Sequence, residues 1–181
     1  MTSYEKRKYK ESLLSHEELL RLFFLDEENN CLIRKIKLSS KDKIGAKAGY
    51  LDKSTGYRRM TIHGVEYKEH RLIWFYVHGE WPEGKLDHKN QVRHDNNINN
   101  LRPVTNSQNG INHQMYKNNL TGFNGVNLAG YYADGTPKYQ AFIRLDRYLH
   151  YIGTYKSLWQ AYKARAKREF ELFGEYSSIS C

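Results

Sequence analysis

Residues 85–109 read KLDHKNQVRHDNNINNLRPVTNSQN, and this stretch decides the fold. Lys85 to His88 has the composition of a short strand, a polar loop rich in asparagine follows, and Ile98 to Val104 returns to apolar residues. Thr105 to Gln108 fits a capping box, which predicts that a helix begins there. The expected order is therefore strand, loop, strand, helix. Asn109 and His113, four residues apart, would share one face of that helix.

The same stretch carries the groups that hydrolysis of a phosphodiester with one metal ion requires. That reaction needs a hard cation, oxygen ligands for it and a neutral imidazole that deprotonates water. Asp87 and Asn109 can supply oxygen ligands, and His88 can supply the imidazole. Neighbouring residues on a strand point to opposite faces, so Asp87 can face the helix and the cation while His88 faces the water.

The chain before this stretch predicts an arm and a short helix. Residues 1–15 are rich in charge and indicate a loose, solvated arm, with phosphate contact by its Lys and Arg side chains as the alternative. Ser15 to Glu18 fits a second capping box, and the apolar residues from Leu19 to Phe23 supply the buried face of a helix.

Between this helix and the deciding stretch, the sequence predicts a small sheet and a buried helix. Strand-like pieces such as Cys31 to Ile36 and Tyr57 to Ile62 are separated by turns at Ser54–Gly56 and His63–Gly64. Glu69 to His78 has an unbroken apolar centre and stops at a glycine, which is typical of a buried helix.

The composition indicates a polyanionic partner. The formal net charge is +9 over 181 residues, and Lys and Arg bind phosphates with release of counterions. Nucleic acid is favoured over an anionic membrane. The length allows one compact domain or two small ones, and a hydrophobic content of 39% supplies only modest cores.

The composition also excludes several classes of protein. The longest apolar run, Leu72 to Val77, has six residues, whereas a membrane-spanning helix needs about 18. The first ten residues are polar, unlike a signal sequence. Cys31 and Cys181 are too few for a disulfide framework or a four-thiolate zinc site. We therefore expect a soluble protein of the cytoplasm.

Five motifs occur together between residues 69 and 109: Glu69-His70-Arg71-Leu72-Ile73-Trp74, His78-Gly79-Glu80-Trp81-Pro82, Asp87-His88, Asp95-Asn96-Asn97-Ile98-Asn99-Asn100-Leu101-Arg102 and Ser107-Gln108-Asn109. This combination resembles the HNH homing endonucleases of phages, which belong to the His-Me finger, or ββα-metal, nucleases. The spacing strengthens the resemblance. Asn100 lies twelve residues after His88 and Asn109 nine residues later, as in the subgroup whose third motif residue is Asn.

The resemblance implies a role for each residue of the site. His88 would be the general base, Asn100 would orient it, and Asp87 with Asn109 would bind one divalent cation. Hard oxygen ligands favour Mg²⁺ or Mn²⁺. Arg102 would clamp the cleaved phosphate, or be an ordinary surface arginine. The substrate would be double-stranded DNA, cut to 5′-phosphate and 3′-hydroxyl ends in the host cell, bacterial or phage-infected, by water that His88 Nε2 deprotonates. Activity should then fall below about pH 6.5.

Several nearby residues have alternative interpretations. His113 is an alternative metal ligand, although the spacing fits Asn109 better. His70 is expected to be a structural histidine that hydrogen-bonds to the backbone. Of the asparagines from Asn96 to Asn100, only the last is expected to act chemically. Gln91 stands where the family usually has glycine, so the loop either takes another shape or tolerates strain of about 1 kcal/mol.

The C-terminal part resembles the ethylene-response-factor type of DNA-binding domain. The resemblance covers residues 119–126, 138–145 and 151–155 and the terminal helix, and it implies a three-stranded sheet packed on one helix. If the sheet face is the DNA face, the contacts are Lys138, Gln140, Arg144, Arg147 and Tyr151. On the helix, Ser157 and Gln160 fit a capping box. A stripe at helical spacing is predicted to be core: Trp159, Tyr162, Ala166, Phe170 and Phe173.

We therefore expect an α+β protein with a nuclease domain to about residue 114 and a small DNA-binding domain over residues 115–181. One centre per chain suggests a monomer that nicks one strand, and a dimer that cuts both strands stays open. The main rival is a non-catalytic DNA-binding protein on a decayed nuclease scaffold, and RNA binding or cleavage is a third possibility. The intact site residues argue against decay, whereas Gln91 favours it.

Overall fold

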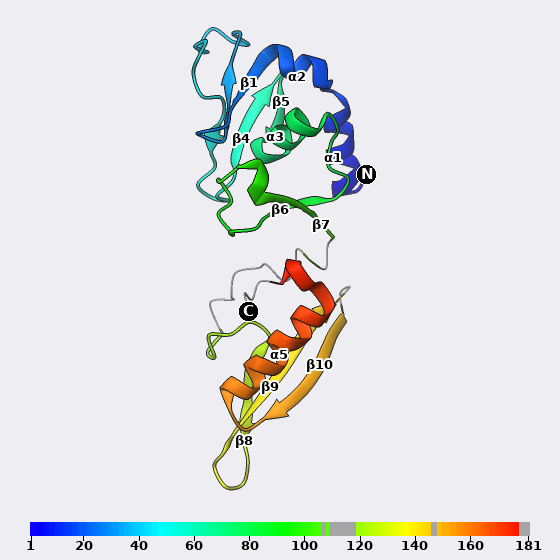
Figure 1. Ribbon diagram of the computed structural model, residues 1–181, viewed down its shortest axis with the longest axis vertical. Helices are drawn as coiled ribbons and strands as arrows, with labels where there is room; N and C mark the ends of the chain where they lie inside the picture. Colours follow the sequence, from blue (N-terminus) through cyan, green and yellow to red (C-terminus); the bar gives the residue numbers. More distant parts are fainter. Residues whose placement is uncertain (106–107, 109–118, 146–147, 178–181) are drawn as a thin grey trace. The chain divides into compact units, whose positions relative to one another are not determined.

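The computed structural model divides the chain into two compact units, Met1–Pro103 and Val104–Cys181 (Figure 1). The structure describes residues 1–105, 108, 119–145 and 148–177. Helices and strands are mixed along the chain, which confirms the expected α+β class. The division lies earlier in the chain than the boundary expected near residue 114.

The described elements up to the end of the first unit are, in chain order, α1 (Ser3–Ser12), α2 (His16–Leu22), β1 (Phe23–Asp26), β2 (Cys31–Arg34), β3 (Tyr50–Leu51), β4 (Arg58–Ile62), β5 (Val65–Lys68), α3 (Glu69–His78), β6 (Lys85–His88), η1 (Ile98–Asn100) and β7 (Leu101–Val104). The strands form three small sheets, in the orders β1-β2, β3-β4-β5 and β6-β7. The first two sheets are antiparallel.

Helix α3 lies at the centre of the first unit's core and has the bounds that the sequence predicts. Its buried residues Leu72, Ile73 and Phe75 join apolar side chains of α2, β2 and β4 in one cluster. The helix ends because Gly79 adopts the left-handed conformation, at φ 75°, where glycine pays no steric cost. This helix fixes the positions of Glu69 and His70 at its first turn.

The predicted tight turns are confirmed. Ile62 of β4 pairs with Val65 of β5, so His63 and Gly64 alone form the connection. Both of these residues have positive φ, at 48° and 78°, as the two central residues of a type I′ hairpin turn require. The turn at Ser54–Gly56 also ends in a left-handed glycine, at φ 75°.

The prediction of a loose N-terminal arm is wrong. Residues Ser3–Ser12 form α1, which begins at a reciprocal capping box between Thr2 and Glu5. The carboxylate of Glu11 is buried and accepts a hydrogen bond of 2.7 Å from Arg71 Nε on α3. This ion pair joins residues 60 positions apart, so no local pattern could show it.

The beginning of α2 is confirmed, and its predicted end is wrong. Ser15 is the N-cap, and its side chain accepts a hydrogen bond from the backbone N–H of Glu18. Phe23, expected on the helix, instead begins strand β1 and is fully buried there.

From residue 119 on, the described part of the second unit contains a three-stranded antiparallel sheet and a long helix. The strands β8 (Val126–Tyr131), β9 (Pro137–Leu145) and β10 (Tyr148–Tyr155) are arranged in the order β10-β9-β8. Helix α5 (Leu158–Phe173), followed by the short turn η2 (Gly174–Tyr176), packs on this sheet. Val126 and Ala141 of the sheet are buried against Ala161 of the helix. This arrangement agrees with the sheet and helix that the sequence predicts.

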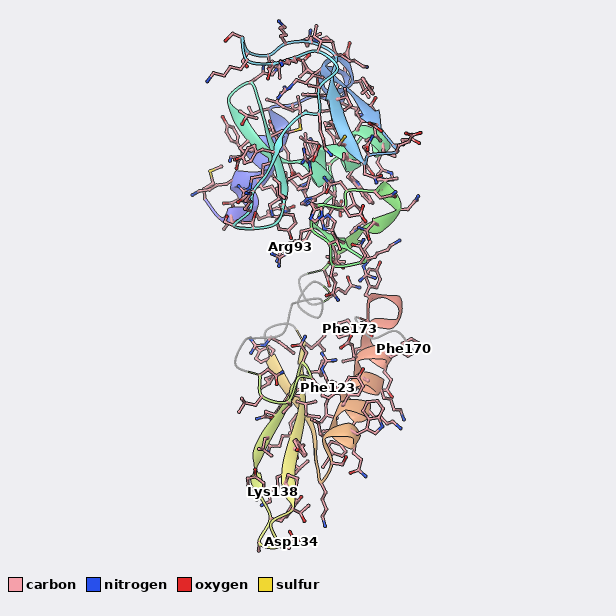
Figure 2. All side chains as sticks on the ribbon, turned by 90° about the vertical axis from the view of Figure 1, so that its left-hand side faces the viewer. Arg93, Phe123, Asp134, Lys138, Phe170 and Phe173 are labelled. Atoms are coloured by element: carbon pink, nitrogen blue, oxygen red, sulfur yellow. The ribbon has the colours of Figure 1, made fainter. Side chains whose placement is uncertain are left out.

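The predicted core stripe on α5 is wrong for two of its residues. Trp159 and Phe170 are each 54% exposed, and Phe170 points away from the sheet, whereas Phe173 lies on the buried side (Figure 2). The buried face of α5 is Ala161, Arg165, Glu169 and Phe173. It includes a buried ion pair between Arg165 and Glu169, which a search for apolar spacing overlooks. The predicted capping bond of the Ser157 side chain is absent among the described residues.

Candidate active site

Strands β6 and β7 hydrogen-bond to each other and bring Asp87 and Arg102, two of the predicted site residues, together. Along β6 the burial alternates, with Leu86 and His88 buried and Asp87 partly exposed. The two residues of the Asp-His pair therefore face opposite sides of the strand, as the sequence predicts. The ladder continues past the strand ends, where Lys89 N–H donates to the Asn100 carbonyl at 2.9 Å.

The predicted capping box after β7 is confirmed. Thr105 N–H donates to Gln108 Oε1 at 2.8 Å, and Gln108 N–H donates to Thr105 Oγ1 at 3.2 Å. The residues expected on the following helix, Asn109 and its alternative His113, lie outside the described residues. The second proposed metal ligand therefore stays a prediction.

Asn100 ties together the loop between the two strands. Its Oδ1 accepts from the backbone N–H of Asn90 at 3.1 Å, and its Nδ2 donates to the Asp95 carbonyl at 2.9 Å. The side chain thus links Asn90 and Asp95 of the loop, so its influence on His88 is indirect. Within this loop Gln91 has φ 62°, which is the left-handed conformation that a glycine would favour. The loop keeps a turn with positive φ despite lacking a glycine there.

His88 is buried among aromatic rings. It is 3% exposed, and its ring centroid lies 5.1 Å from that of His70 and 6.0 Å from that of Tyr57. Its Nε2, expected to face the attacking water, instead lies 3.4 Å from Oδ1 of Asn96. Burial lowers the pKa of His88 below its usual 6.5, although Asn96 opposes this shift. The imidazole is therefore neutral at pH 7, as a general base requires.

Asn96 connects His88 to a buried carboxylate, that of Glu69, which was not predicted to belong to the site. Asn96 Nδ2 donates to Glu69 Oε2 at 3.1 Å, and that carboxylate also pairs with Arg58. Asn96 and Glu69 are 1% and 0% exposed. A possible signal in the sequence is the carboxylate of Glu69 on an otherwise apolar helix, since a charge is seldom buried without a partner.

Asp87 and Arg102 form an ion pair across the two strands. Oδ2 of Asp87 accepts from Arg102 Nε at 3.1 Å and from Nη2 at 3.0 Å. Both side chains are mostly buried, at 12% and 14% exposure. Arg102 thus lies beside the carboxylate that was predicted to hold the cation, and it is not an isolated surface arginine.

His70 is buried, as expected, but its Nδ1 does not make the expected hydrogen bond to the backbone of the described residues. Within the described part of the chain, its Nδ1 has no hydrogen-bond partner. Its pKa is held well below 6.5, mainly because of burial and also because of the neighbouring His88. His70 therefore packs as a neutral ring against Tyr57 and His88.

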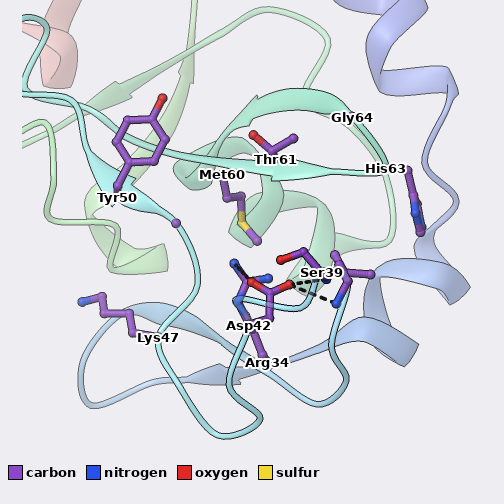
Figure 3. A pocket seen from close by; sticks show the side chains of 11 residues that line it. Arg34, Ser39, Asp42, Lys47, Tyr50, Met60, Thr61, His63 and Gly64 are labelled. Atoms are coloured by element: carbon purple, nitrogen blue, oxygen red, sulfur yellow. Dashed lines mark hydrogen bonds and ion pairs between the residues drawn. The ribbon is translucent and has the colours of Figure 1, made fainter.

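A surface hollow of about 420 Å³ lies elsewhere in the first unit, and Figure 3 shows it. It is lined by residues of β2 to β4 and the adjoining loops, among them Arg34, Lys47 and Tyr50. Arg34 is paired with Asp42 at 3.2 Å inside the hollow. Its lining includes none of the described residues of the predicted site.

Four of the five predicted DNA contacts lie on one face of the second unit's sheet. On β9, Ala141 and Ile143 are buried on the side of α5, so Lys138, Gln140 and Arg144 alternate onto the opposite side.

Strand β10 adds Tyr151 to this open face. Tyr151 pairs with Phe142, with ring centroids 5.6 Å apart, so both belong to the face away from α5. The fifth predicted contact, Arg147, lies outside the described residues. Phe142 was not among the predicted contacts, because the sequence did not show which residues of β9 alternate onto this face.

Comparison with known proteins gives one partial match, over about a quarter of the chain. A family model described as HNH endonuclease matches residues 67–111, which covers α3, β6, the loop and β7. The match supports a nuclease of the HNH class, whose members act on DNA and generally depend on a divalent metal. No curated protein and no solved structure is detectably similar to the chain.

Two negative findings accompany this match. Within the described ranges, no group of three or more His, Cys, Asp or Glu side chains could hold a metal ion. The helices of the same described residues include none that is long and apolar enough to span a membrane.

Proposed function

We propose that this chain is a metal-dependent endonuclease that hydrolyses phosphodiester bonds of double-stranded DNA at His88. The observation that carries the proposal is the buried imidazole of His88 on β6, which burial keeps neutral, while Asp87, the preceding residue, places its carboxylate on the other side of the strand. The HNH match over residues 67–111 supports it independently. In this role His88 takes a proton from water, and the resulting hydroxide attacks phosphorus. The bond to the 3′-oxygen then breaks and that oxygen takes up a proton, which leaves 5′-phosphate and 3′-hydroxyl ends.

Asp87 and Asn109 would hold one divalent cation, Mg²⁺ or Mn²⁺. When bound, such a cation supplies positive charge that stabilises the phosphate as it becomes more negative. The carboxylate of Asp87 is a hard oxygen donor of the kind these ions prefer. Its mostly buried position strengthens its attraction to a cation, and Arg102 at 3.0 Å competes for the same oxygen.

Two further residues have supporting roles in this proposal. The guanidinium of Arg102 is charged at any working pH and presents several donors, so it can hold a phosphate when the substrate arrives. Asn100 is a positioning residue, because it holds the loop between β6 and β7 through Asn90 and Asp95. The open sheet face of the second unit would bind the DNA backbone and bases.

The rival function is DNA binding without cleavage. Two observations favour it: His88 is only 3% exposed, and Asp87 is already paired with Arg102. Two observations count against it. Gln91 adopts the positive φ that a glycine would favour at this position, and β6 and β7 pair with each other.

A digest of supercoiled plasmid separates the two functions. The proposal predicts cleavage in Mg²⁺ and none with a chelator. An open-circle product would indicate nicking, and a linear product would indicate paired cuts by a homing-type enzyme. Plasmid that stays supercoiled in Mg²⁺ and in Mn²⁺, while the protein still binds it, would support the rival. Tighter binding of duplex RNA than of DNA would count against both.

A further inference from the structure

A buried chain of polar side chains reaches His88 from across the first unit. Arg58 of β4 pairs with Glu69 of α3, Glu69 accepts from Asn96 of the site loop, and Asn96 faces His88 of β6. Three of the four residues are at most 3% exposed. Four separate elements thus place one hydrogen-bonded chain in the core, where an unsatisfied polar group is costly.

Glu69 fixes the direction of this chain because each of its hydrogen-bond partners among the described residues is a donor. Its Oε2 accepts from Arg58 Nε and from Asn96 Nδ2, and its Oε1 accepts from the backbone N–H of Leu32 at 3.4 Å. Burial raises the pKa of Glu69 and Arg58 opposes this shift, but the geometry is clear because both carboxyl oxygens face N–H donors and therefore accept. The amide of Asn96 must therefore turn its NH₂ group toward Glu69.

The orientation of Asn96 determines which nitrogen of His88 carries the proton. With Nδ2 turned to Glu69, the carbonyl Oδ1 faces His88 Nε2 at 3.4 Å. A carbonyl oxygen only accepts, so Nε2 must be the nitrogen that carries hydrogen. In a neutral imidazole the other nitrogen, Nδ1, then has the free lone pair.

We infer that Glu69 and Asn96 are positioning residues that hold His88 in the Nε2–H tautomer, so that Nδ1 accepts the proton from the attacking water. The role in catalysis rests on the proposed function, whereas the tautomer is a property of the folded chain. The rings of His70 and Tyr57, whose centroids lie 5.1 Å and 6.0 Å from that of His88, keep the imidazole from rotating by 180°.

Nitrogen-15 NMR of the full chain at neutral pH, without DNA, tests the tautomer directly. We expect His88 Nε2 to show the shift of a protonated ring nitrogen and Nδ1 that of an unprotonated one. In Asn96→Ala both shifts should move toward each other, because the acceptor that selects one tautomer is gone. The matched control is Asn99→Ala, an exposed residue of the same asparagine run, which should leave both shifts unchanged. The inference would be overturned if His88 of the wild-type chain were protonated at Nδ1, or if its nitrogen-15 shifts did not change in Asn96→Ala.

Kinetics test the consequence for cleavage. Asn96→Ala should lower kcat about 10- to 100-fold with KM changed less than about threefold, the range typical of partners that orient a functional histidine. Asn96→Asp alone places two carboxylates in contact and should also lower kcat. Adding Glu69→Gln lets position 69 donate to the new carboxylate at position 96 and should restore at least part of the loss. Thermal unfolding shows at which temperature each variant is folded, and kcat is compared there.

The two failures are distinguishable. If the chain does not cut DNA but His88 shows the Nε2–H tautomer and its dependence on Asn96, the proposed function is refuted and the control of the tautomer by Asn96 is supported. If Asn96→Ala cuts DNA as fast as the wild-type chain at a temperature where it is folded, the positioning role is refuted and the proposed function is supported.

Discussion

At the scale of single residues, the protonation of His88 sets the pH range of the proposed reaction. Burial lowers the pKa of His88 below 6.5, so the neutral form persists to a lower pH than a solvated histidine allows. The midpoint of the loss of activity on acidification should therefore lie below pH 6.5, as the imidazole becomes protonated. A profile of kcat/KM against pH measures this midpoint, and a midpoint above 6.5 would contradict the described burial.

Gln91 is a second position where one residue can be tested alone. Its φ of 62° is costly for a side chain, by about 1 kcal/mol, but replacement by glycine also increases the freedom of the unfolded chain. Gln91→Gly should therefore change the free energy of unfolding by less than about 1 kcal/mol. Gln91→Val should destabilise by about 1–2 kcal/mol more, because β-branched residues avoid this conformation. Urea unfolding measures both, and equal stability of the two variants would show that the turn is not strained.

At the scale of elements, α1 supports the chain that leads into the site. Arg71 of α3 binds Glu11 of α1 and also donates to the carbonyls of Pro82 and Gly84, at 2.8 and 2.9 Å, just before β6. Glu11→Ala would leave a buried guanidinium without its carboxylate. It should lower the free energy of unfolding by about 3 kcal/mol.

Glu17→Ala is the matched control for this prediction, because Glu17 is exposed on the neighbouring helix. It should change stability by no more than about 0.5 kcal/mol. Urea unfolding of the full chain compares the two variants. An equally small effect of Glu11→Ala would mean that α1 is the solvated arm that the sequence alone indicated.

The elements also show how far the sequence can be interpreted. Helix α3, the hairpin turn at His63–Gly64 and the capping box at Thr105 were predictable because each has a signal within a few residues. Helix α1 was missed because its ordering depends on Arg71, 60 residues away.

The candidate site also has features that the sequence predicts and features that it does not. Asp87 and His88 are adjacent in the chain, and their opposite facing follows from the alternation of a strand. The partnership of Asn96 with Glu69 joins positions 27 residues apart, so it needed the fold. The buried face of α5 was misplaced because Arg165 and Glu169 neutralise each other in the core.

At the scale of the whole molecule, the positive charge should act mainly through the second unit's open sheet face. Lys138→Ala and Arg144→Ala should weaken DNA binding. Each should reduce the slope of log affinity against log salt by about 0.9 if it contacts one phosphate. Cleavage at saturating DNA should be unchanged, because neither residue belongs to the site.

The matched control for the sheet face is Lys167→Ala, an exposed lysine of α5, which packs on the opposite side of the sheet. Binding measured by fluorescence anisotropy over a range of salt concentrations compares the three variants. If Lys167→Ala lowers affinity as much as Arg144→Ala, the DNA face has been assigned wrongly.

The most direct measurement is single-turnover cleavage of plasmid DNA in Mg²⁺ by the wild-type chain, His88→Ala and His94→Ala. His94 is an exposed histidine of the same loop, so its loss controls for the removal of an imidazole. We expect His88→Ala to lose cleavage by at least about a hundredfold while DNA affinity stays the same, and His94→Ala to cut normally. Cleavage by His88→Ala at the wild-type rate would show that His88 is not the general base.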